Sequence, residues 1–334
     1  QSFPMTFTVT AEGRSGELEV DLVARAEDGH EVATGAARVT LVAEERSDAS
    51  VMLEPSDFVV NTSLAGAQRL TFSFATNGRQ VAARPDGSFV IAWSNDCSQL
   101  GRCDELARAF DATARPQRNE VSMSTDEFLV NQSEVFGQDP AVAVNETTTL
   151  VCWYSDADLW CSAFDLDGAH LDFSDLLVTT GTGVSEPDVA ALADGDFVVV
   201  WSEANADDTA RVIRGQLIGS DGQPAVNPVT DDAGVFPIST AAIGFAETPA
   251  VTASGGHGYA VVWLDGNDVY GRFFDADGFP RPSEQVAVVE TADDLTAVWG
   301  PKVGWRAGAA LISWGVQSFD TPPFENGAYV MKAV

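Results

Sequence analysis

A sequence pattern that predicts strand, tight turn and strand occurs five times in this chain of 334 residues, and it constrains the fold more than any other feature. The clearest copy spans residues 187–201, where Pro-Asp-Val-Ala is followed by an Asp-Gly turn and the run Phe-Val-Val-Val-Trp. Two short apolar segments joined by Asp-Gly predict a β-hairpin. Each copy ends on a tryptophan: Trp93, Trp153, Trp201, Trp263 and Trp314.

Two further strands follow most copies of the pattern. A polar loop leads to a third strand, and an Asp-Gly turn then leads to a fourth, as at Asp167-Gly168 and Asp277-Gly278. Four short strands in a repeat of about 40–60 residues are typical of a β-propeller blade. The second strands are apolar on both faces, so both faces need cover. Stacking of blade on blade supplies that cover.

The last copy lacks a fourth strand at the C-terminal end, and a matching segment stands near the front of the chain. Residues 57–63 (Asp-Phe-Val-Val-Asn-Thr-Ser) resemble residues 127–133 (Glu-Phe-Leu-Val-Asn-Gln-Ser), the fourth strand of the first copy. The sequence therefore predicts an all-β chain with a five-bladed propeller at 56–334. In this ring residues 57–63 complete the last blade and remove the open edge.

Residues 1–55 show period-2 patterns separated by turn signals, which predict a small Ig-like β-sandwich domain. Four strands are few for a closed sandwich, and the chain begins abruptly at Gln1-Ser2-Phe3-Pro4. We therefore expect that further chain precedes Gln1: a signal, a lipid anchor or more strands.

Three short motifs recur along the chain: Pro-x-Val-Ala, Asp-Gly-x-Phe-Val-Val-x-Trp and Phe-Asp-x-x-Gly. They resemble the repeat propellers of secreted or lipid-anchored bacterial surface proteins, a mostly uncharacterised family, over residues 57–334. The third copy departs from the pattern, with Leu217-Ile218-Gly219 where others have Phe-Asp. The resemblance implies a propeller fold and an extracellular, periplasmic or outer-surface location, and it implies no particular activity.

The charge is strongly acidic, with 50 Asp and Glu against 18 Lys and Arg and a net charge of −32. Such a surface repels nucleic acid and anionic membranes, so neither is an expected partner. No run of 18 apolar residues exists, so no transmembrane helix is expected. Because the acids are spread along the chain, we interpret them as a solubilising surface without a cofactor, with a calcium site as the alternative.

The four cysteines form two close pairs, Cys97 with Cys103 and Cys152 with Cys161. Neither spacing is typical of a zinc site, and the chain has only three histidines. Two local disulfides fit better, and they imply an oxidising compartment.

The preferred function is that of a non-catalytic binding or scaffolding protein. The loops after the second strands are rich in acids, and aromatic residues accompany them at the same predicted end of the ring. Such a surface suits a protein, a glycan or a cationic ligand; the oligomeric state stays open. The predicted ligand-binding residues are Trp299, Phe319, Asp156, Asp158, Asp207, Asp208, Asp265 and Asp268.

The alternative is a glycosidase-like hydrolase, because this ring also resembles five-bladed glycosidases with carboxylates where inner strands meet the channel. Asp139, Glu186 and Asp188 precede inner-strand valines and could meet at the channel mouth. The bland interpretation is that they are solvated turn acids beside prolines. Three carboxylates close together would favour an enzyme, and carboxylates splayed into solvent would favour binding.

Overall fold

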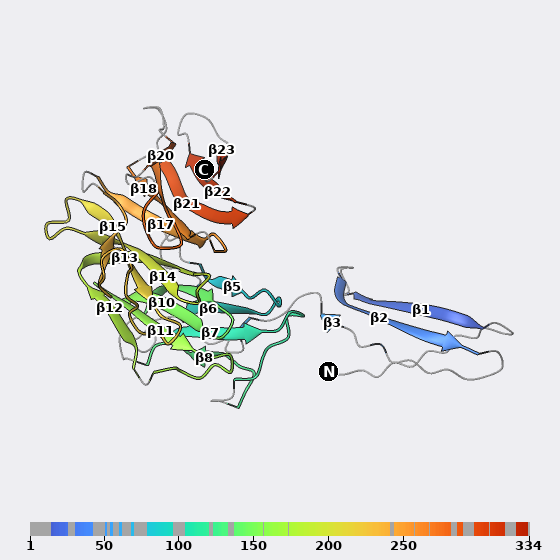
Figure 1. Ribbon diagram of the computed structural model, residues 1–334. Helices are drawn as coiled ribbons and strands as arrows, with labels where there is room; N and C mark the ends of the chain where they lie inside the picture. The colour runs from blue at the N-terminus through green and yellow to red at the C-terminus, as the bar shows by residue number, and fades with distance from the viewer. Residues whose placement is uncertain are drawn as a thin grey trace. The chain divides into compact units, whose positions relative to one another are not determined.

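The computed structural model gives two compact units, Gln1–Val59 and Val60–Val334, and each is considered by itself (Figure 1). The described parts of both units consist of strands, turns and coil, which confirms the all-β prediction. In the part of the chain that the structure describes, no helix has the length and apolar character that a membrane crossing needs. The described residues are 15–25, 31–42, 51, 54–55, 60–61, 68–69, 79–95, 104–119, 123–132, 137–155, 157–172, 174–240, 244–256, 258–266, 268–281, 286–289, 297–306, 308–317 and 325–332.

The first unit contains one sheet among its described residues. Strand β1 (Gly16–Arg25) pairs antiparallel with β2 (Glu31–Leu41), and β3 (Glu54–Pro55) pairs with the other edge of β2. The Ig-like sandwich therefore stays a prediction.

The second unit contains five small antiparallel sheets among its described residues, in chain order (Figure 1). Sheet 1 holds β4 (Gln68–Arg69), β5 (Val81–Ala83), β6 (Phe89–Asn95), β7 (Glu105–Phe110) and β8 (Phe128–Leu129); sheet 2 holds β9 (Gln138–Val144), β10 (Thr149–Ser155), β11 (Asp158–Phe164) and β12 (Leu176–Thr180); sheet 3 holds β13 (Thr182–Ala191), β14 (Phe197–Ala204), β15 (Arg211–Ile218) and β16 (Phe236–Pro237); sheet 4 holds β17 (Ala246–Ala253), β18 (Tyr259–Asp265), β19 (Asp268–Phe274) and β20 (Val286–Val289); sheet 5 holds β21 (Ala297–Arg306), β22 (Ala309–Gln317) and β23 (Glu325–Lys332).

The sheets pack face on face through their first and second strands, β9 against β13, β13 against β17 and β17 against β21. Along β14, Val199 and Trp201 pack toward sheet 2, whereas Val198 and Val200 pack toward sheet 4. This explains why the second strands are apolar on both faces. Four of the repeated tryptophans, Trp153, Trp201, Trp263 and Trp314, pack in clusters that join neighbouring sheets, and the first three are fully buried. The prediction of a propeller-like fold is thus confirmed.

The aspartate of the Phe-Asp motif stabilises the turn that follows it. The Asp165 carboxylate accepts hydrogen bonds from the backbone N–H groups of Asp167 (3.0 Å) and Ala169 (2.8 Å). Asp275 does the same for Asp277 and Phe279. Asp side chains stabilise tight turns in this way. These acids are therefore framework.

The predicted disulfide between Cys152 and Cys161 is confirmed, and it joins directly opposed positions on β10 and β11. Cys97 and Cys103 lie outside the described residues, so their pairing stays a prediction. Residues 57–59 and 62–63 of the predicted closing strand also lie outside them.

Candidate functional site

Three inner strands carry the same backbone distortion at the same position. Asp139, Glu186 and Thr248 each lie three residues before an inner-strand valine, and each has a positive φ, of 49°, 59° and 50°. The ladder register shifts there in all three strands. Left-handed backbone costs non-glycine residues about 1–3 kcal/mol, and bulges re-aim side chains beside functional sites. Glycine stands at the equivalent positions 78 and 300.

Two of the predicted acids lie within electrostatic range of each other in what we call the carboxyl cluster, which comprises Glu105, Asp139 and Glu186 together with Tyr154. The Asp139 charge acts on both Glu105 and Glu186, so the three carboxyl groups from sheets 1, 2 and 3 are electrostatic neighbours. Burial, and then Asp139, raise the pKa of Tyr154, whose hydroxyl donates to Gln138 Oε1 (2.9 Å). Asp139 is fully buried and Glu186 is half-buried. These acids are therefore not splayed into solvent.

Glu186 has the proton affinity of a general acid. Burial raises its pKa to about 7, and the neighbouring Glu247 and Asp139 charges act in the same direction. The backbone N–H of Thr248 donates to Glu186 Oε2 (2.6 Å), which opposes the shift. Enzymes tune glutamates into this range so that they hold a transferable proton at neutral pH.

The buried acid that the sequence prediction missed is Glu105, with a fully buried side chain. Burial raises its pKa to about 8, with Asp139 and Asp104 adding to the rise; the Ser94 hydroxyl, which donates to both carboxyl oxygens (2.8 and 3.0 Å), opposes it. The repeat itself contains a sequence signal for Glu105. Glu105 pairs with the residue that follows the repeated tryptophan, and the equivalent third-strand residues in sheets 2, 3 and 4 are apolar and fully buried: Leu159, Ile213 and Val269.

An arginine lies beside the cluster at the loop end of sheet 3. Arg211 donates to Gly183 O (2.6 Å), to Ser185 Oγ (2.6 Å) and to Ser202 Oγ (2.9 Å). Its guanidinium also lies 3.7 Å from Glu247, and its charge opposes the rise in the pKa of Glu186. Arg211 therefore holds the backbone on which Glu186 stands.

The same loop end carries an exposed aromatic ring. Phe245 has 48% of its surface exposed and immediately precedes β17. The Arg211 N–H donates to Gly244 O (3.0 Å), which fixes this segment beside β15. Because side chains two apart in a strand share a face, Phe245 and Glu247 lie on the same side. Glu247 faces Arg211, so Phe245 stands on the Arg211 side of the strand.

The third predicted acid, Asp188, belongs to a different group, which we call the ion cluster: Arg79, Asp188 and Lys302. Asp188 accepts hydrogen bonds from the N–H groups of Val251 (2.8 Å) and Arg79 (3.3 Å). The Arg79 guanidinium donates to Val251 O (2.8 Å). Burial raises the pKa of Asp188, while Arg79 and Lys302 oppose that rise. These contacts join inner segments of sheets 1, 3, 4 and 5, so Asp188 is a structural tie.

The residues predicted to bind a ligand lie at the loop ends of several sheets where they are described, and their role stays a prediction. Asp207 accepts from Thr209 Oγ1 (2.7 Å) within its own turn, and Asp208 lies 3.8 Å from Arg211. Asp158 begins β11, whereas Asp265 and Asp268 flank the β18–β19 turn on another sheet. Asp156, Phe319 and the side chain of Trp299 lie outside the described residues.

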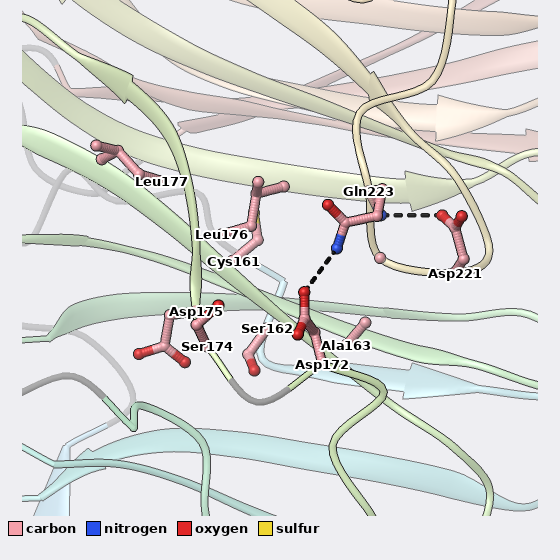
Figure 2. A pocket seen from close by; sticks show the side chains of 11 residues that line it. Cys161, Ser162, Ala163, Asp172, Ser174, Asp175, Leu176, Leu177, Asp221 and Gln223 are labelled. Atoms are coloured by element: carbon pink, nitrogen blue, oxygen red, sulfur yellow. Dashed lines mark hydrogen bonds between the residues drawn. The ribbon is translucent and has the colours of Figure 1, made fainter.

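A polar pocket of about 290 Å³ lies between sheets 2 and 3 (Figure 2), and no residue of the carboxyl cluster lines it. Its acids hold loops together: Gln223 donates to Asp172 (3.1 Å) and to Asp221 (3.0 Å), and Asp175 accepts from Gln132 N (2.9 Å). Among the described residues, no group of three His, Cys, Asp or Glu side chains is arranged to hold a metal ion. Calcium binding stays an untested prediction.

No family model matches the sequence, and no curated protein matches it. Solved structures do resemble the fold. The GH93 α-L-arabinofuranosidase of Fusarium graminearum in complex with arabinobiose shares 11% identity over 94% of this chain and 92% of its own, with a TM-score of 0.50. An endo-arabinase from Bacteroides thetaiotaomicron shares 11% identity over 78% of this chain and 98% of its own, with a TM-score of 0.42. A structure named as a glycoside hydrolase shares 12% identity; this chain spans 59% of it, with a TM-score of 0.39.

Identities this low show similarity of fold and do not identify a substrate. One of the similar structures nevertheless corrects the functional prediction, because it matches nearly the whole of this chain and is that of a glycoside hydrolase. Asp139, which is fully buried, and Glu186, which is half-buried, also differ from the solvated turn acids that the bland interpretation required. The prediction of a non-catalytic binding or scaffolding protein is therefore wrong, and the findings favour its alternative, a glycosidase-like hydrolase.

Proposed function

We propose that this chain is a glycosidase-like hydrolase in which Glu186 is the general acid and Asp139 is the second carboxylate. One observation carries the proposal. Asp139 and Glu186 occupy equivalent strained positions on adjacent sheets, and they are electrostatic neighbours in a largely buried site. Backbone strain kept at two equivalent positions that both present carboxyl groups is typical of a functional site.

The chemistry needs two carboxyl groups in different protonation states. Glu186 holds its proton near neutral pH and donates it to the leaving glycosidic oxygen. Asp139, as a carboxylate, stabilises the positive charge that develops on the sugar ring, or activates water. Arg211 and the Thr248 N–H keep Glu186 from becoming so weak an acid that it could not release the proton.

The surroundings support a neutral glycoside as substrate. A chain of net charge −32 repels anionic sugars. Phe245 offers an exposed aromatic face near the carboxyl cluster, and sugar rings pack on such faces. The solved arabinofuranosidase of similar fold contains arabinobiose, which makes this disaccharide a suitable first probe.

Hydrolysis of arabinobiose and of a panel of aryl glycosides tests the proposal. Glu186→Gln should lower kcat on arabinobiose about 100-fold or more, because a positioned acid contributes about 10²–10⁴. It should lose less on nitrophenyl glycosides, whose leaving groups need little protonation. Asp139→Asn should lose activity on both substrates.

The matched control is Glu146→Gln, which changes an exposed glutamate in the turn after β9. It should behave as the wild type. A wild-type protein that hydrolyses nothing in the panel, or equal activity in all variants, would contradict the proposal.

We also propose that the ring has five blades closed by residues 57–63. Arg108 on β7 donates to Val60 O (2.9 Å), just as Arg272 on β19 donates to Ile238 O (2.7 Å) beyond the fourth strand of sheet 3. Both arginines lie 5.5 Å from the centre of a following phenylalanine ring. Val60 thus resembles the end of a fourth strand belonging to the preceding blade.

Two truncations test the closure. Removing residues 1–55 should leave the melting temperature of the ring nearly unchanged, whereas removing residues 1–63 should lower it by several degrees, because an edge is opened. Equal melting temperatures would contradict it.

The Cys152–Cys161 disulfide supports a further part of the proposal, that the protein works in an extracellular or periplasmic compartment.

A further inference from the structure

Glu105 occupies a register position that holds apolar residues in sheets 2, 3 and 4. It is the first residue of β7 and is fully buried, as are Leu159, Ile213 and Val269 at the equivalent register positions. A buried carboxylate is costly unless it is paired with a cation. The described residues place no lysine or arginine within ion-pair distance of Glu105. A group retained at such a cost needs a reason beyond packing.

The side chain of Glu105 lies directly under the segment that carries Asp139. A Cβ atom added to Gly137 would lie only 2.6 Å from Glu105 Oε1, so the carboxyl group touches the backbone two residues before Asp139. Ser94 holds both carboxyl oxygens from β6, and Asn131 Oδ1 accepts from the Glu105 N–H (2.8 Å). Glu105 is therefore fixed from sheet 1 and presses against the start of β9.

We propose that Glu105 is a positioning residue for Asp139, and that as a neutral carboxylic acid it supports the 137–139 segment without adding a second charge beside Asp139. The inference rests on the proposed hydrolase function for the role of Asp139. Its physical basis is packing and charge: an apolar residue would fill the space without the hydrogen bonds, and a carboxylate would repel Asp139.

The ionisable groups that face Glu105 agree with a neutral acid. They are Asp104 on its own segment, Asp139 on β9 and Tyr154 on β10, and none of them is a cation. Burial, followed by Asp139 and Asp104, raises the pKa of Glu105 to about 8 against the Ser94 hydrogen bond, from an ordinary value of 4.5. The folded state therefore binds this proton more tightly than the unfolded state does. The resulting stabilisation is complete below about pH 4.5 and is lost as the pH rises through about 8.

Denaturant unfolding of the full chain between pH 5 and pH 9 tests the neutral acid. The wild type and the Glu146→Gln control should lose stability as the pH rises, and Glu105→Gln should lose clearly less because its amide cannot ionise. Identical pH dependence in Glu105→Gln and the wild type would overturn the neutral acid.

Hydrolysis of arabinobiose tests the positioning. Glu105→Leu, which introduces the residue found at the equivalent position 159, should lower kcat about tenfold or more with little change in KM. Glu105→Gln, which keeps the shape and one acceptor for the Ser94 hydroxyl, should retain more of the activity. Full activity in Glu105→Leu would overturn the positioning role.

A third readout separates this inference from the proposed function. The ¹³C chemical shift of the Asp139 carboxyl group, followed against pH, should move between the wild type and Glu105→Leu even if no glycoside is hydrolysed. If the wild type hydrolyses no glycoside but the Asp139 chemical shift still differs between the wild type and Glu105→Leu, the proposed hydrolase function is wrong. The influence of Glu105 on Asp139 then stands. An unchanged Asp139 titration in both Glu105 variants would overturn the inference itself.

Discussion

Two groups of buried acids lie side by side near the inner strands, and they differ in their counter-charges. In the ion cluster, Asp188 faces Arg79 and Lys302 and accepts two backbone N–H groups from neighbouring sheets. In the carboxyl cluster, Glu186 lies only two residues away along β13, yet its neighbours include Asp139 and Glu247. The same strand thus carries one acid whose charged neighbours, Arg79 and Lys302, favour its ionised form, and one whose neighbours Glu247 and Asp139 disfavour it while Arg211 favours it.

This difference gives Asp188 a structural role and Glu186 a chemical one. A carboxyl group that accepts N–H groups from other sheets holds the inner strands together, and Arg79 and Lys302 oppose the rise that burial causes in the pKa of Asp188. A carboxyl group surrounded by other acids keeps its proton toward neutral pH, as a general acid must. Both acids precede the same inner-strand valine, so local sequence does not distinguish them; the contacts from other sheets do.

The largest expected effect is on stability at Asp188. Asp188→Asn should lower the free energy of unfolding by about 3 kcal/mol, because the buried Val251 N–H and the Arg79 N–H lose a charged hydrogen-bond acceptor and Arg79 and Lys302 lose its attraction. Glu186→Gln should show the opposite sign at pH 8, a gain of about 2 kcal/mol. The pKa of Glu186 is raised to about 7, so the stability that it contributes when protonated is lost as the pH rises through 7, and glutamine avoids that loss.

Urea unfolding of both variants at pH 5 and pH 8 measures this contrast. At pH 5, where Glu186 is protonated in the folded chain, Glu186→Gln should match the wild type. The distinction between the two clusters fails if Asp188→Asn is harmless or if Glu186→Gln is destabilising at both pH values.

The fold followed from sequence because its signal is local and repeated. Each tryptophan such as Trp201 marks a second strand, and the apolar run before it packs on two neighbouring sheets. The Asp-Gly turns and the Cys152–Cys161 pair are likewise set by residues close in the chain. The first unit was harder, because a few alternating strands do not define a partner sheet.

The site was predictable only in part, because its chemistry depends on residues from different sheets. Alignment on the inner-strand valines found Asp139 and Glu186, and their positive φ angles could not be foreseen from two acidic residues. The same alignment grouped Asp188 with them. It could not separate Asp188, because the cations near Asp188 come from sheets 1 and 5 and are not visible in the local sequence. The sequence analysis missed Glu105 because it considered the third strands only for the turns that follow them. Comparison with Leu159 and Ile213 would have shown a carboxyl group at a position that is apolar in those strands.

The smallest expected effect concerns Phe245, which tests whether the carboxyl cluster is the end of the molecule that meets a ligand. Thr248, whose N–H binds Glu186, lies three residue steps after Phe245, so the ring stands about 10 Å along the strand from that contact. That distance fits a sugar next to the one being cleaved. Phe245→Ala should raise KM for arabinobiose about fivefold, the loss of roughly 1 kcal/mol of aromatic packing, and Phe245→Tyr should restore it. Phe279→Ala removes a similarly exposed ring, 45% against 48%, from the turn at the opposite end of sheet 4, and it should leave KM unchanged. Equal effects of the two alanine variants would mean that the loop end beside Glu186 is not where the substrate lies, and the contrast between the two clusters would then describe proton affinity alone.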